Sequence, residues 1–294
     1  MTPTTWHIRD LLKVTSDYLR KKEIENPRLN AEVLMAHQLS VERISLYLNF
    51  DQPLTDKEVS GYRSLIRRRL KREPLQYITG TQEFWSLDFF VNQEVLIPRP
   101  ETEIVVDQVI NFAKSSARPE DHDLKILDLG TGSGAISVAL AKELPRALVW
   151  ATDISEGALS MARRNATKHG VSDRIEFLQG DLWEPLMNLG VIFDIVVSNP
   201  PYVSSKEYDD LPPEIRDYEP RVALNGREGG MYYLNKIIKG AYDFINPGGL
   251  LILEMAPDQT QKALTIMDQT AAYGEKARIK DYSHRYRVVV GSKP

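Results

Sequence analysis

The tetrapeptide Asn199-Pro200-Pro201-Tyr202 places a carboxamide and a phenol around two consecutive prolines, directly after the apolar stretch 193–198. The prolines lack an N–H and fix their own φ, so a strand cannot continue through them. The side-chain carbonyl of Asn199 and the rigid backbone carbonyl of Pro200 can accept hydrogen bonds from the NH₂ of a planar substrate group, on which Tyr202 can pack. A bare Asn-Pro would indicate only a turn. The full tetrapeptide predicts a substrate site, with Asn199, Pro200 and Tyr202 as catalytic residues.

A glycine-rich loop follows another apolar stretch, and an acidic residue precedes it. The loop consists of Gly130, Thr131, Gly132, Ser133 and Gly134. Glycine is required where a ligand approaches the backbone or where φ is positive. The loop lacks the Lys-Ser/Thr pair of a phosphate-binding P-loop. Asp128, just before it, would suit the amino-acid end of a ligand better than a pyrophosphate.

Two further acidic residues end the next two predicted strands. Asp153 can accept hydrogen bonds from both hydroxyls of a ribose, although a NAD enzyme could use the same acid. Asp181 can accept from an exocyclic adenine amine, while Leu182 or Trp183 packs on the ring; the alternative is a turn aspartate followed by core residues. The glycine loop, Asp153 and Asp181 in this order favour S-adenosylmethionine over NAD. Asn199 would then lie beside the methyl group of this cofactor, where transfer needs mainly an in-line approach.

Alternating strands and helices must position these residues. Apolar stretches at 124–130, 147–153, 174–181 and 193–199 alternate with helical patterns at 134–144 and 155–170. This pattern indicates a parallel sheet covered on both faces. A long loop, helix 230–245, strand 248–256, another helix and strands 276–282 and 286–292 complete the predicted order.

The first 100 residues have a different pattern of apolar residues. Residues 1–75 place apolar residues at three- and four-residue intervals, which predicts a helical bundle. The sequence from Leu75 onward is rich in aromatic and β-branched residues and predicts a β-hairpin, with Gly80 and Val91–Glu94 as turn points; residues 76–100 are the predicted hairpin linker. Residues 101–294, with a helix at 101–116 and a polar loop at 117–123, form the predicted catalytic domain.

The amino-acid composition argues against several classes of function. The chain has 294 residues and no cysteine, and its five histidines are scattered, so we expect no disulfide, thiolate nucleophile or catalytic metal. The first residues lack the apolar segment of a secretory signal, and no apolar run could span a bilayer, so a cytoplasmic protein is expected. Residues 1–75 carry 14 basic and 10 acidic side chains. The basic stretch 62–72 indicates a solvated helix face more readily than a grip on nucleic acid.

Three motifs together, behind a helical front domain, resemble the PrmC/HemK family of peptide-chain release factor glutamine methyltransferases. They are "DLGTGSG" at 128–134, "NPPY" at 199–202 and "LIPRPETE" at 96–103, with "PLQYITG" at 74–80 as a further selective segment. The resemblance covers essentially the whole chain. It implies a seven-stranded Rossmann-like sheet with an antiparallel last hairpin, cofactor contacts at Gly130–Gly134, Asp153, Leu182-Trp183 and Asn199, and a substrate site at 199–202. Arg99 and Glu101 match the family's segment without an assigned role.

The resemblance implies S-adenosylmethionine-dependent methylation of the glutamine in the Gly-Gly-Gln loop of class I release factors, and no direct nucleic-acid partner. Glutamine methylation of a ribosomal protein uses the same tetrapeptide and stays open. Amino methylation of a nucleic-acid base would need clustered basic residues, yet residues 76–294 carry 23 basic and 31 acidic side chains. A scaffold that binds cofactor without catalysis would have no use for the Asn199 carboxamide.

Overall fold

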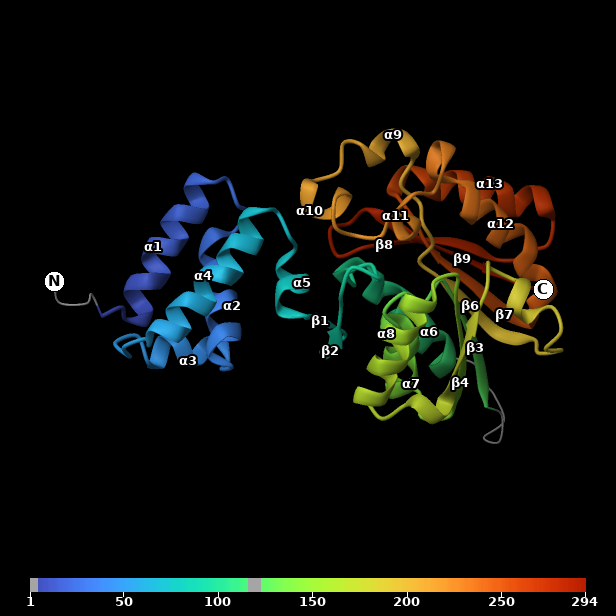
Figure 1. Cartoon of the computed structure of the whole chain (residues 1–294). Helices are drawn as coiled ribbons and strands as arrows, with labels where there is room; N and C mark the ends of the chain where they lie inside the picture. Colours follow the sequence, from blue (N-terminus) through green and yellow to red (C-terminus); the bar gives the residue numbers. More distant parts are fainter. Residues whose placement is uncertain (1–4, 116–122) are drawn as a thin grey trace. The chain divides into compact units, whose positions relative to one another are not determined.

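The computed structural model describes residues 5–115 and 123–294, so most of the polar loop predicted at 117–123 lies outside the described residues. The chain forms two compact units (Figure 1). We call residues 1–80 with 213–218 the helical unit, and residues 81–212 with 219–294 the catalytic unit. No helix within the described ranges is both long and apolar enough to cross a membrane.

The helical unit is built from amphipathic helices, as the three- and four-residue spacing predicts. Its apolar faces meet in one core, in which Leu12, Leu34 and Tyr62 are almost fully buried. A capping box starts the longest helix: the Thr55 hydroxyl accepts from the Glu58 N–H, and the Glu58 carboxylate accepts from the Thr55 N–H. The helices are α1 (Ile8–Lys21), α2 (Pro27–Leu39), α3 (Arg43–Leu48), α4 (Asp56–Leu70), α5 (Leu75–Thr79) and α10 (Pro213–Arg216).

The predicted hairpin is confirmed, but it is shorter than expected and turns elsewhere. Its first residues form helix α5, which buries Tyr77 and Ile78 and ends at Gly80 in the left-handed conformation. Strands β1 (Thr81–Phe84) and β2 (Leu87–Phe90) are joined by Trp85 and Ser86, both with positive φ. A two-residue turn with this geometry matches the twist of the two strands. Trp and Ser are unusual at turn positions with positive φ, so the sequence did not predict a turn at these two residues.

The catalytic unit contains the predicted seven-stranded sheet, in the order β5-β4-β3-β6-β7-β9-β8. The neighbours from β5 to β7 are parallel, whereas β9 runs antiparallel to both β7 and β8. The strands are β3 (Leu124–Leu129), β4 (Ala147–Asp153), β5 (Ile175–Gln179), β6 (Phe193–Ser198), β7 (Ile245–Glu254), β8 (Lys276–Lys280) and β9 (Tyr286–Ser292).

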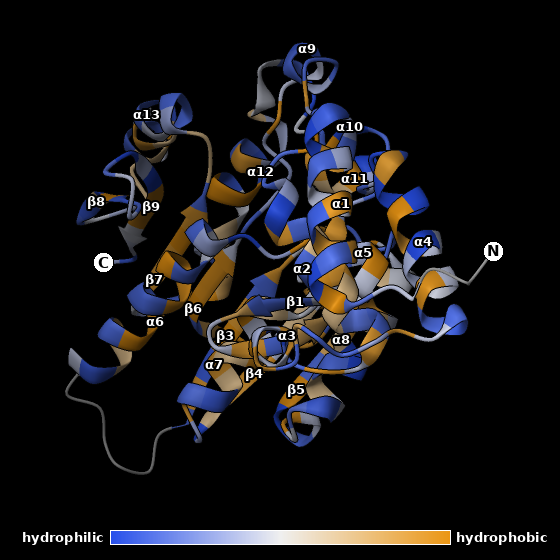
Figure 2. Ribbon diagram, turned by 90° about the vertical axis from the view of Figure 1, so that its left-hand side faces the viewer, coloured by the Kyte–Doolittle hydropathy of each residue, from blue (hydrophilic) through white to orange (hydrophobic). Residues whose placement is uncertain are grey.

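Helices cover both faces of this sheet, so its strands are apolar on both sides. Ile126 of β3 faces the core under helices α6, α7 and α8, whereas its neighbour Leu127 faces the core under α12 and α13. Figure 1 shows these two helical layers, and Figure 2 shows the apolar colour concentrated on the strands between them. The helices are α6 (Glu103–Ser115), α7 (Ala135–Glu143), α8 (Glu156–Lys168), α12 (Tyr232–Gly240) and α13 (Thr260–Thr270).

Short helical segments connect these elements. The long loop between β6 and α12, predicted without structure of its own, contains several of them. The short segments of the catalytic unit are the 3₁₀ helices η1 (Pro100–Thr102), η2 (Ser172–Arg174), η3 (Glu184–Leu186), η4 (Glu228–Gly230), η5 (Ala241–Phe244) and η6 (Pro257–Gln259), with α9 (Ser205–Tyr208) and α11 (Arg221–Leu224). Of these, α9, α11 and η4 lie in the long loop.

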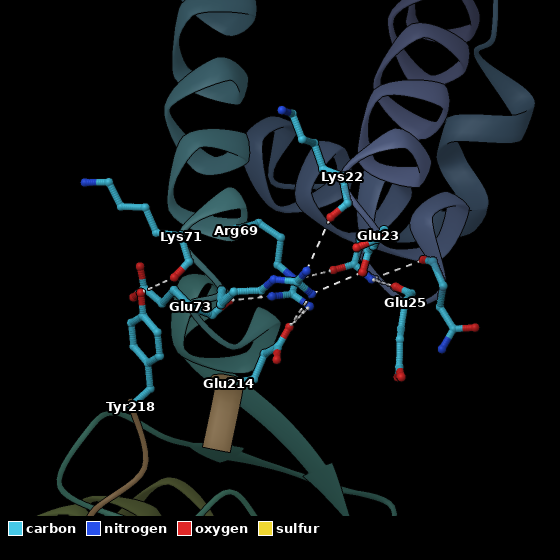
Figure 3. Close-up of polar contacts among 11 residues, drawn as sticks. Lys22, Glu23, Glu25, Arg69, Lys71, Glu73, Glu214 and Tyr218 are labelled. Atoms are coloured by element: carbon cyan, nitrogen blue, oxygen red, sulfur yellow. Dashed lines mark hydrogen bonds and ion pairs between the residues drawn. The ribbon is translucent and has the colours of Figure 1, made fainter. Parts of the chain in front are cut away.

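Six residues of that long loop, 213–218, belong to the helical unit; we call them the inserted hexapeptide. The carboxylate of Glu214 accepts from Arg69 at 3.1 Å and from Arg72 at 3.4 Å, and the Tyr218 hydroxyl donates to the Lys71 carbonyl at 2.6 Å (Figure 3). The Arg69 side chain is only 7% exposed. The hexapeptide thus supplies the carboxylate for a buried guanidinium.

Replacing Glu214 with glutamine is expected to destabilise the helical unit by about 1–2 kcal/mol at pH 7, because the amide oxygen can still accept hydrogen bonds but the negative charge that strengthens the bonds from Arg69 and Arg72 is lost. Burial would raise the pKa of Glu214, but a backbone hydrogen bond and the two arginines lower it overall. A lowered pKa means that this stabilisation is present above the pKa of the unfolded carboxyl and disappears as the pH falls through the folded pKa. Thermal unfolding and hydrogen exchange of α4 should show the loss at pH 7, and the loss should disappear once the pH falls below the lowered pKa of Glu214.

Asp217→Asn is the matched control for this prediction. Asp217 lies in the same hexapeptide but forms an exposed ion pair with Arg216. Exposed pairs contribute little, so we expect no measurable change in stability. Equal effects of the two substitutions would show that Glu214 has no special part in holding the hexapeptide.

Candidate active site

A pocket with about 1040 Å³ of free space lies at the carboxyl ends of β3, β4 and β6. The strand order reverses between β3 and β6, which is where open α/β sheets bind ligands. The predicted site residues that line it are Gly130, Thr131, Gly132, Ser133, Asp153, Asp181, Leu182, Asn199 and Pro201.

The glycine loop presents bare backbone to this pocket. Gly130 and Gly132 have φ of +74° and +55°, and a Cβ built on either would meet nothing within 4 Å. A ligand can therefore approach the backbone directly. Gly134 has a different reason: a Cβ there would lie 3.0 Å from the Cβ of Ala162, so this glycine allows α7 to approach α8. Gly134 shapes the loop from behind rather than lining the pocket.

Asp128 holds the loop in place, contrary to the expectation that it faces the ligand. It is fully buried, and its Oδ2 accepts from the hydroxyls of Thr131 and Ser137 at 2.7 and 2.6 Å. Its Oδ1 has no hydrogen-bond partner. Burial raises the pKa of Asp128 to about 6, against the lowering effect of the two hydroxyls. The residue fixes Thr131, which does line the pocket.

Asp153, the last residue of β4, is oriented by backbone N–H groups. Its Oδ2 accepts from Gly132 at 2.9 Å and its Oδ1 from Ser155 at 2.9 Å. Burial raises the pKa of Asp153, although these hydrogen bonds oppose the shift. Each carboxylate oxygen has a second lone pair, so the group can still accept from a pair of ligand hydroxyls. The same carboxylate thus joins the glycine loop to the position expected for a ribose.

Of the two residues after Asp181, Leu182 lines the pocket and Trp183 does not. Leu182 has a φ of +50°, which turns the chain at this point. The ring of Trp183 instead stacks on Phe244, with centroids 4.8 Å apart and planes 6° from parallel, and its N–H donates to the Lys236 carbonyl. Trp183 therefore belongs to the core beside α12, and Leu182 is the member of the pair at the expected adenine position.

Asn199 follows the last residue of β6 and lines the pocket with Pro201, while Pro200 is buried. The Asn199 NH₂ donates to the Thr102 hydroxyl at 3.0 Å. Thr102 also lines the pocket and lies within the "PRPETE" segment, but it was not among the predicted site residues. The segment was noted in the sequence; only the contact shows which of its residues reaches Asn199.

Tyr202 does not have the position expected of a ring that packs on substrate. It is not among the lining residues, and its ring packs against the core under α12 and α13. Its hydroxyl donates to Glu254 Oε1 at 3.2 Å. Burial and the nearby Glu254 carboxylate raise the pKa of the phenol. Tyr202 therefore fixes the tetrapeptide to the core on the side away from the pocket.

Arg99, whose role was left open, lines the pocket and donates to the nearly fully buried Glu219. The second carboxylate oxygen of Glu219 accepts from the Ile97 N–H at 3.0 Å. This pair joins the segment before η1 to the chain just after the inserted hexapeptide, within the catalytic unit. Glu101 is half-buried and does not line the pocket.

The donor set fits an adenosyl ligand. The pocket combines open glycine backbone, a carboxylate oriented for hydroxyls at Asp153, and an apolar side chain beside an acidic group at Leu182 and Asp181. Among the described residues, no group of three His, Asp or Glu side chains could hold a metal ion.

Comparisons with known proteins agree with this geometry. Residues 10–80 match the family described as PrmC N-terminal domain, and residues 112–212 match the Methyltransferase small domain. The release factor glutamine methyltransferase of Geobacter sulfurreducens is 44% identical over 91% of this chain and 90% of its own. That of Rhodopirellula baltica is 40% identical over 97% and 96%. A crystal structure of a methyltransferase from Pyrococcus furiosus covers 80% of this chain and 98% of its own, with 19% identity and a TM-score of 0.47.

Sheet, pocket and sequence matches together define an S-adenosylmethionine-dependent methyltransferase. The cofactor expected from the glycine loop and the two acids is thereby confirmed. The chain belongs to the family of release factor glutamine methyltransferases.

Proposed function

We propose that this enzyme transfers a methyl group from S-adenosylmethionine to the side-chain amide nitrogen of the glutamine in the Gly-Gly-Gln loop of class I release factors. The relatives that share 40–44% of its residues over nearly the full chain support the substrate. The observation that carries the chemistry is the Asn199 carboxamide, which lines the pocket and is held through its NH₂ by Thr102. Its carbonyl oxygen is left to accept from a substrate amide.

An amide nitrogen is a weak nucleophile because its lone pair is delocalised into its carbonyl. We infer that the Asn199 carbonyl and the Pro200 backbone carbonyl accept the two N–H bonds of the substrate glutamine. Such acceptors orient the nitrogen and raise its electron density. The fixed φ of two prolines keeps both acceptors in register, because small displacements are costly when a reaction depends on alignment.

For the cofactor, we propose that Asp153 accepts from the ribose hydroxyls, that Asp181 and Leu182 contact adenine, and that the Gly130–Gly134 loop lies along the amino-acid part. Among these, only Gly134 does not line the pocket. When bound, S-adenosylmethionine supplies a methyl group on a positively charged sulfur. The chain's part is to hold the two reactants in line and to exclude water from the contact.

The helical unit is proposed to dock the release factor. Helix α3 exposes Ile44 (61%) and Leu48 (78%), which are four residues apart and therefore lie on one helix face. Large exposed apolar residues that cluster are typical of protein interfaces. Residues 10–80 of this unit also match the PrmC N-terminal domain.

Replacing Ile44 and Leu48 together with glutamate is expected to raise KM for an intact release factor by about tenfold, since two apolar contacts worth about 1 kcal/mol are lost. kcat should be unchanged, and so should the rate with a short peptide that contains the target glutamine. Met187→Glu, at a residue 69% exposed in the catalytic unit, is the matched control. Equal losses with peptide and intact protein would rule out docking through α3.

The substrate assignment is tested by incubating the enzyme with labelled cofactor and with release factor, a ribosomal protein preparation, and duplex DNA or RNA in parallel. Mass spectrometry then locates the methyl group. We expect it on the Gly-Gly-Gln glutamine alone. A methyl on a ribosomal-protein glutamine would favour the second candidate, which uses the same tetrapeptide, and a methyl on a base would favour the third.

A further inference from the structure

Arg99 is the one side chain with a positive charge that lines the pocket, counted over the described residues. The other ionisable residues on the lining are three acids and a phenol: Glu94, Asp153, Asp181 and Tyr233. The Arg99 side chain is 30% exposed, so its guanidinium is partly shielded from solvent. Guanidinium groups bind carboxylates through directed N–H bonds, and shielding from water strengthens such bonds. The pocket is therefore suited to a ligand with one anionic group.

S-adenosylmethionine has one anionic group, the carboxylate of its amino-acid part. Its ammonium and sulfonium groups are positive, and its ribose and adenine are neutral. Asp128 was expected to serve the amino-acid end, but it is fully buried and accepts hydrogen bonds from Thr131 and Ser137 instead. The carboxylate of the cofactor therefore still needs a partner in this pocket.

The backbone of the glycine loop is a poor partner for that carboxylate, because most of its N–H groups are already used. Gly130 and Thr131 donate to one carbonyl of β4, each at 2.9 Å. Gly132 donates to the Asp153 carboxylate, and Gly134 donates to the Thr131 carbonyl. A guanidinium, with its five N–H groups, is a better source of donors than amides that are already bonded.

Strand order places Arg99 at the end of the pocket where the amino-acid part is proposed to lie. The proposed adenine and ribose positions, Asp181 and Asp153, follow β5 and end β4, which are neighbours at one edge of the sheet. The rest of the cofactor then extends toward β3 and β6, where Asn199 follows β6. The Arg99 carbonyl accepts from the Thr102 N–H at 3.1 Å, and the Thr102 hydroxyl accepts from Asn199 at 3.0 Å. Arg99 is thus tied to the side of β6, away from the adenine position.

Glu219 holds the Arg99 guanidinium in place. The Glu219 side chain is 1% exposed, and one of its carboxylate oxygens accepts from a terminal nitrogen of Arg99. Its other oxygen accepts from the Ile97 N–H at 3.0 Å, which fixes the carboxylate itself. The bond to Glu219 uses one of the three guanidinium nitrogens, so donors remain for a ligand.

We propose that Arg99 binds the carboxylate in the amino-acid part of S-adenosylmethionine. The inference rests on the proposed cofactor orientation, with the ribose at Asp153, and not on the identity of the methylated substrate. It gives the "PRPETE" segment a second task in the pocket, beside the contact from Thr102 to Asn199. One short turn then binds the cofactor and also orients the carboxamide proposed to bind the substrate.

Calorimetry without a methyl acceptor tests this proposal. It compares two ligands, S-adenosylmethionine and its decarboxylated analogue, which lacks only the carboxylate. Wild-type enzyme should bind the analogue about 10–100-fold more weakly, the range expected for hydrogen bonds between charged groups. Arg99→Met should bind S-adenosylmethionine more weakly by about the same factor, and its affinities for the two ligands should agree within about threefold. The ratio of the two affinities is the readout, because a general disturbance of the pocket would weaken both ligands equally.

Two further variants accompany Arg99→Met. Removing Arg99 alone leaves the Glu219 carboxylate buried without its cation, which can destabilise the fold. The double variant Arg99→Met/Glu219→Gln removes both charges and should lose the preference for the carboxylate in the same way. Lys236→Met is the matched control, because its ammonium lies 3.8 Å from Asp181 beside the pocket but Lys236 does not line it. This variant should keep the wild-type ratio.

Two results would overturn the proposal. Equal affinity of the wild type for both ligands would show that no group in the pocket recognises the carboxylate. A wild-type ratio in Arg99→Met and in the double variant would assign the carboxylate to another donor. Neither result depends on release factors being the substrate, which the methyl-mapping experiment tests separately.

Discussion

Replacing Asn199 with alanine is expected to lower kcat by about 10³-fold, while the affinity for S-adenosylmethionine falls by less than about tenfold. The substitution removes an acceptor that acts on the reacting nitrogen, and single preorganised groups of this kind contribute about 10²–10³ in rate. In our proposal, cofactor binding rests mainly on other residues that line the pocket, including Asp153 and Leu182. Single-turnover methylation of a release factor and calorimetry with the cofactor measure the two effects separately.

Asn199→Gln provides the graded control for the first prediction. It keeps the amide but moves it outward by one methylene, so it no longer fits the 3.0 Å contact with Thr102. If positioning is what matters, this variant should be nearly as slow as alanine. Wild-type turnover in Asn199→Ala would remove the carboxamide from the mechanism, and wild-type turnover in Asn199→Gln would show that alignment is unimportant.

Replacing Asp153 with alanine is expected to weaken binding of S-adenosylmethionine by about 100-fold. The proposed hydrogen bonds from two ribose hydroxyls to a carboxylate would be lost, and hydrogen bonds to charged groups contribute about 1.5–3 kcal/mol each. The Gly132 N–H would also lose its partner, so the glycine loop would be held less firmly. Saturating cofactor should restore most of kcat, because Asp153 is not proposed to contact the substrate amide.

Asp153→Asn and Asp173→Ala are the controls for the second prediction. The asparagine keeps one acceptor and the shape of the group, so an intermediate loss of about tenfold is expected. Asp173 is an exposed acid of η2, and its removal should leave binding unchanged. Calorimetric titration with the cofactor gives all three constants. An unchanged constant for Asp153→Ala would place the ribose elsewhere.

Much of the site could be predicted because its residues follow apolar strands in the sequence. In a parallel sheet the carboxyl ends of all strands lie at one edge, so the residues after β3, β4 and β6 must come together. Gly130, Asp153 and Asn199 stand directly at or after such ends. The sheet and its helical layers followed from the same alternation of apolar and amphipathic segments.

The contacts that orient the site could not be predicted in this way. The partner of Asn199 lies 97 residues away, and no periodicity relates the two positions. The choice between Leu182 and Trp183 depends on one residue with positive φ, which shifts the facing side chain by one position. Tyr202 was expected to pack on a planar substrate group, but its buried hydroxyl needed a partner, and Glu254 supplies it.

Because the inserted hexapeptide belongs to the helical unit, residues 1–80 alone do not contain all of that unit. The family match for this region ends at residue 80, so a fragment with those limits contains Arg69 and Arg72 without Glu214. Exchanging the first 80 residues between two relatives would therefore move Arg69 into the recipient, while the carboxylate with which it pairs stays in the donor. A chimera that also carries residues 213–218 from the same donor keeps Arg69 and Glu214 from one sequence. Residues 1–80 and 213–218 therefore have to be exchanged together.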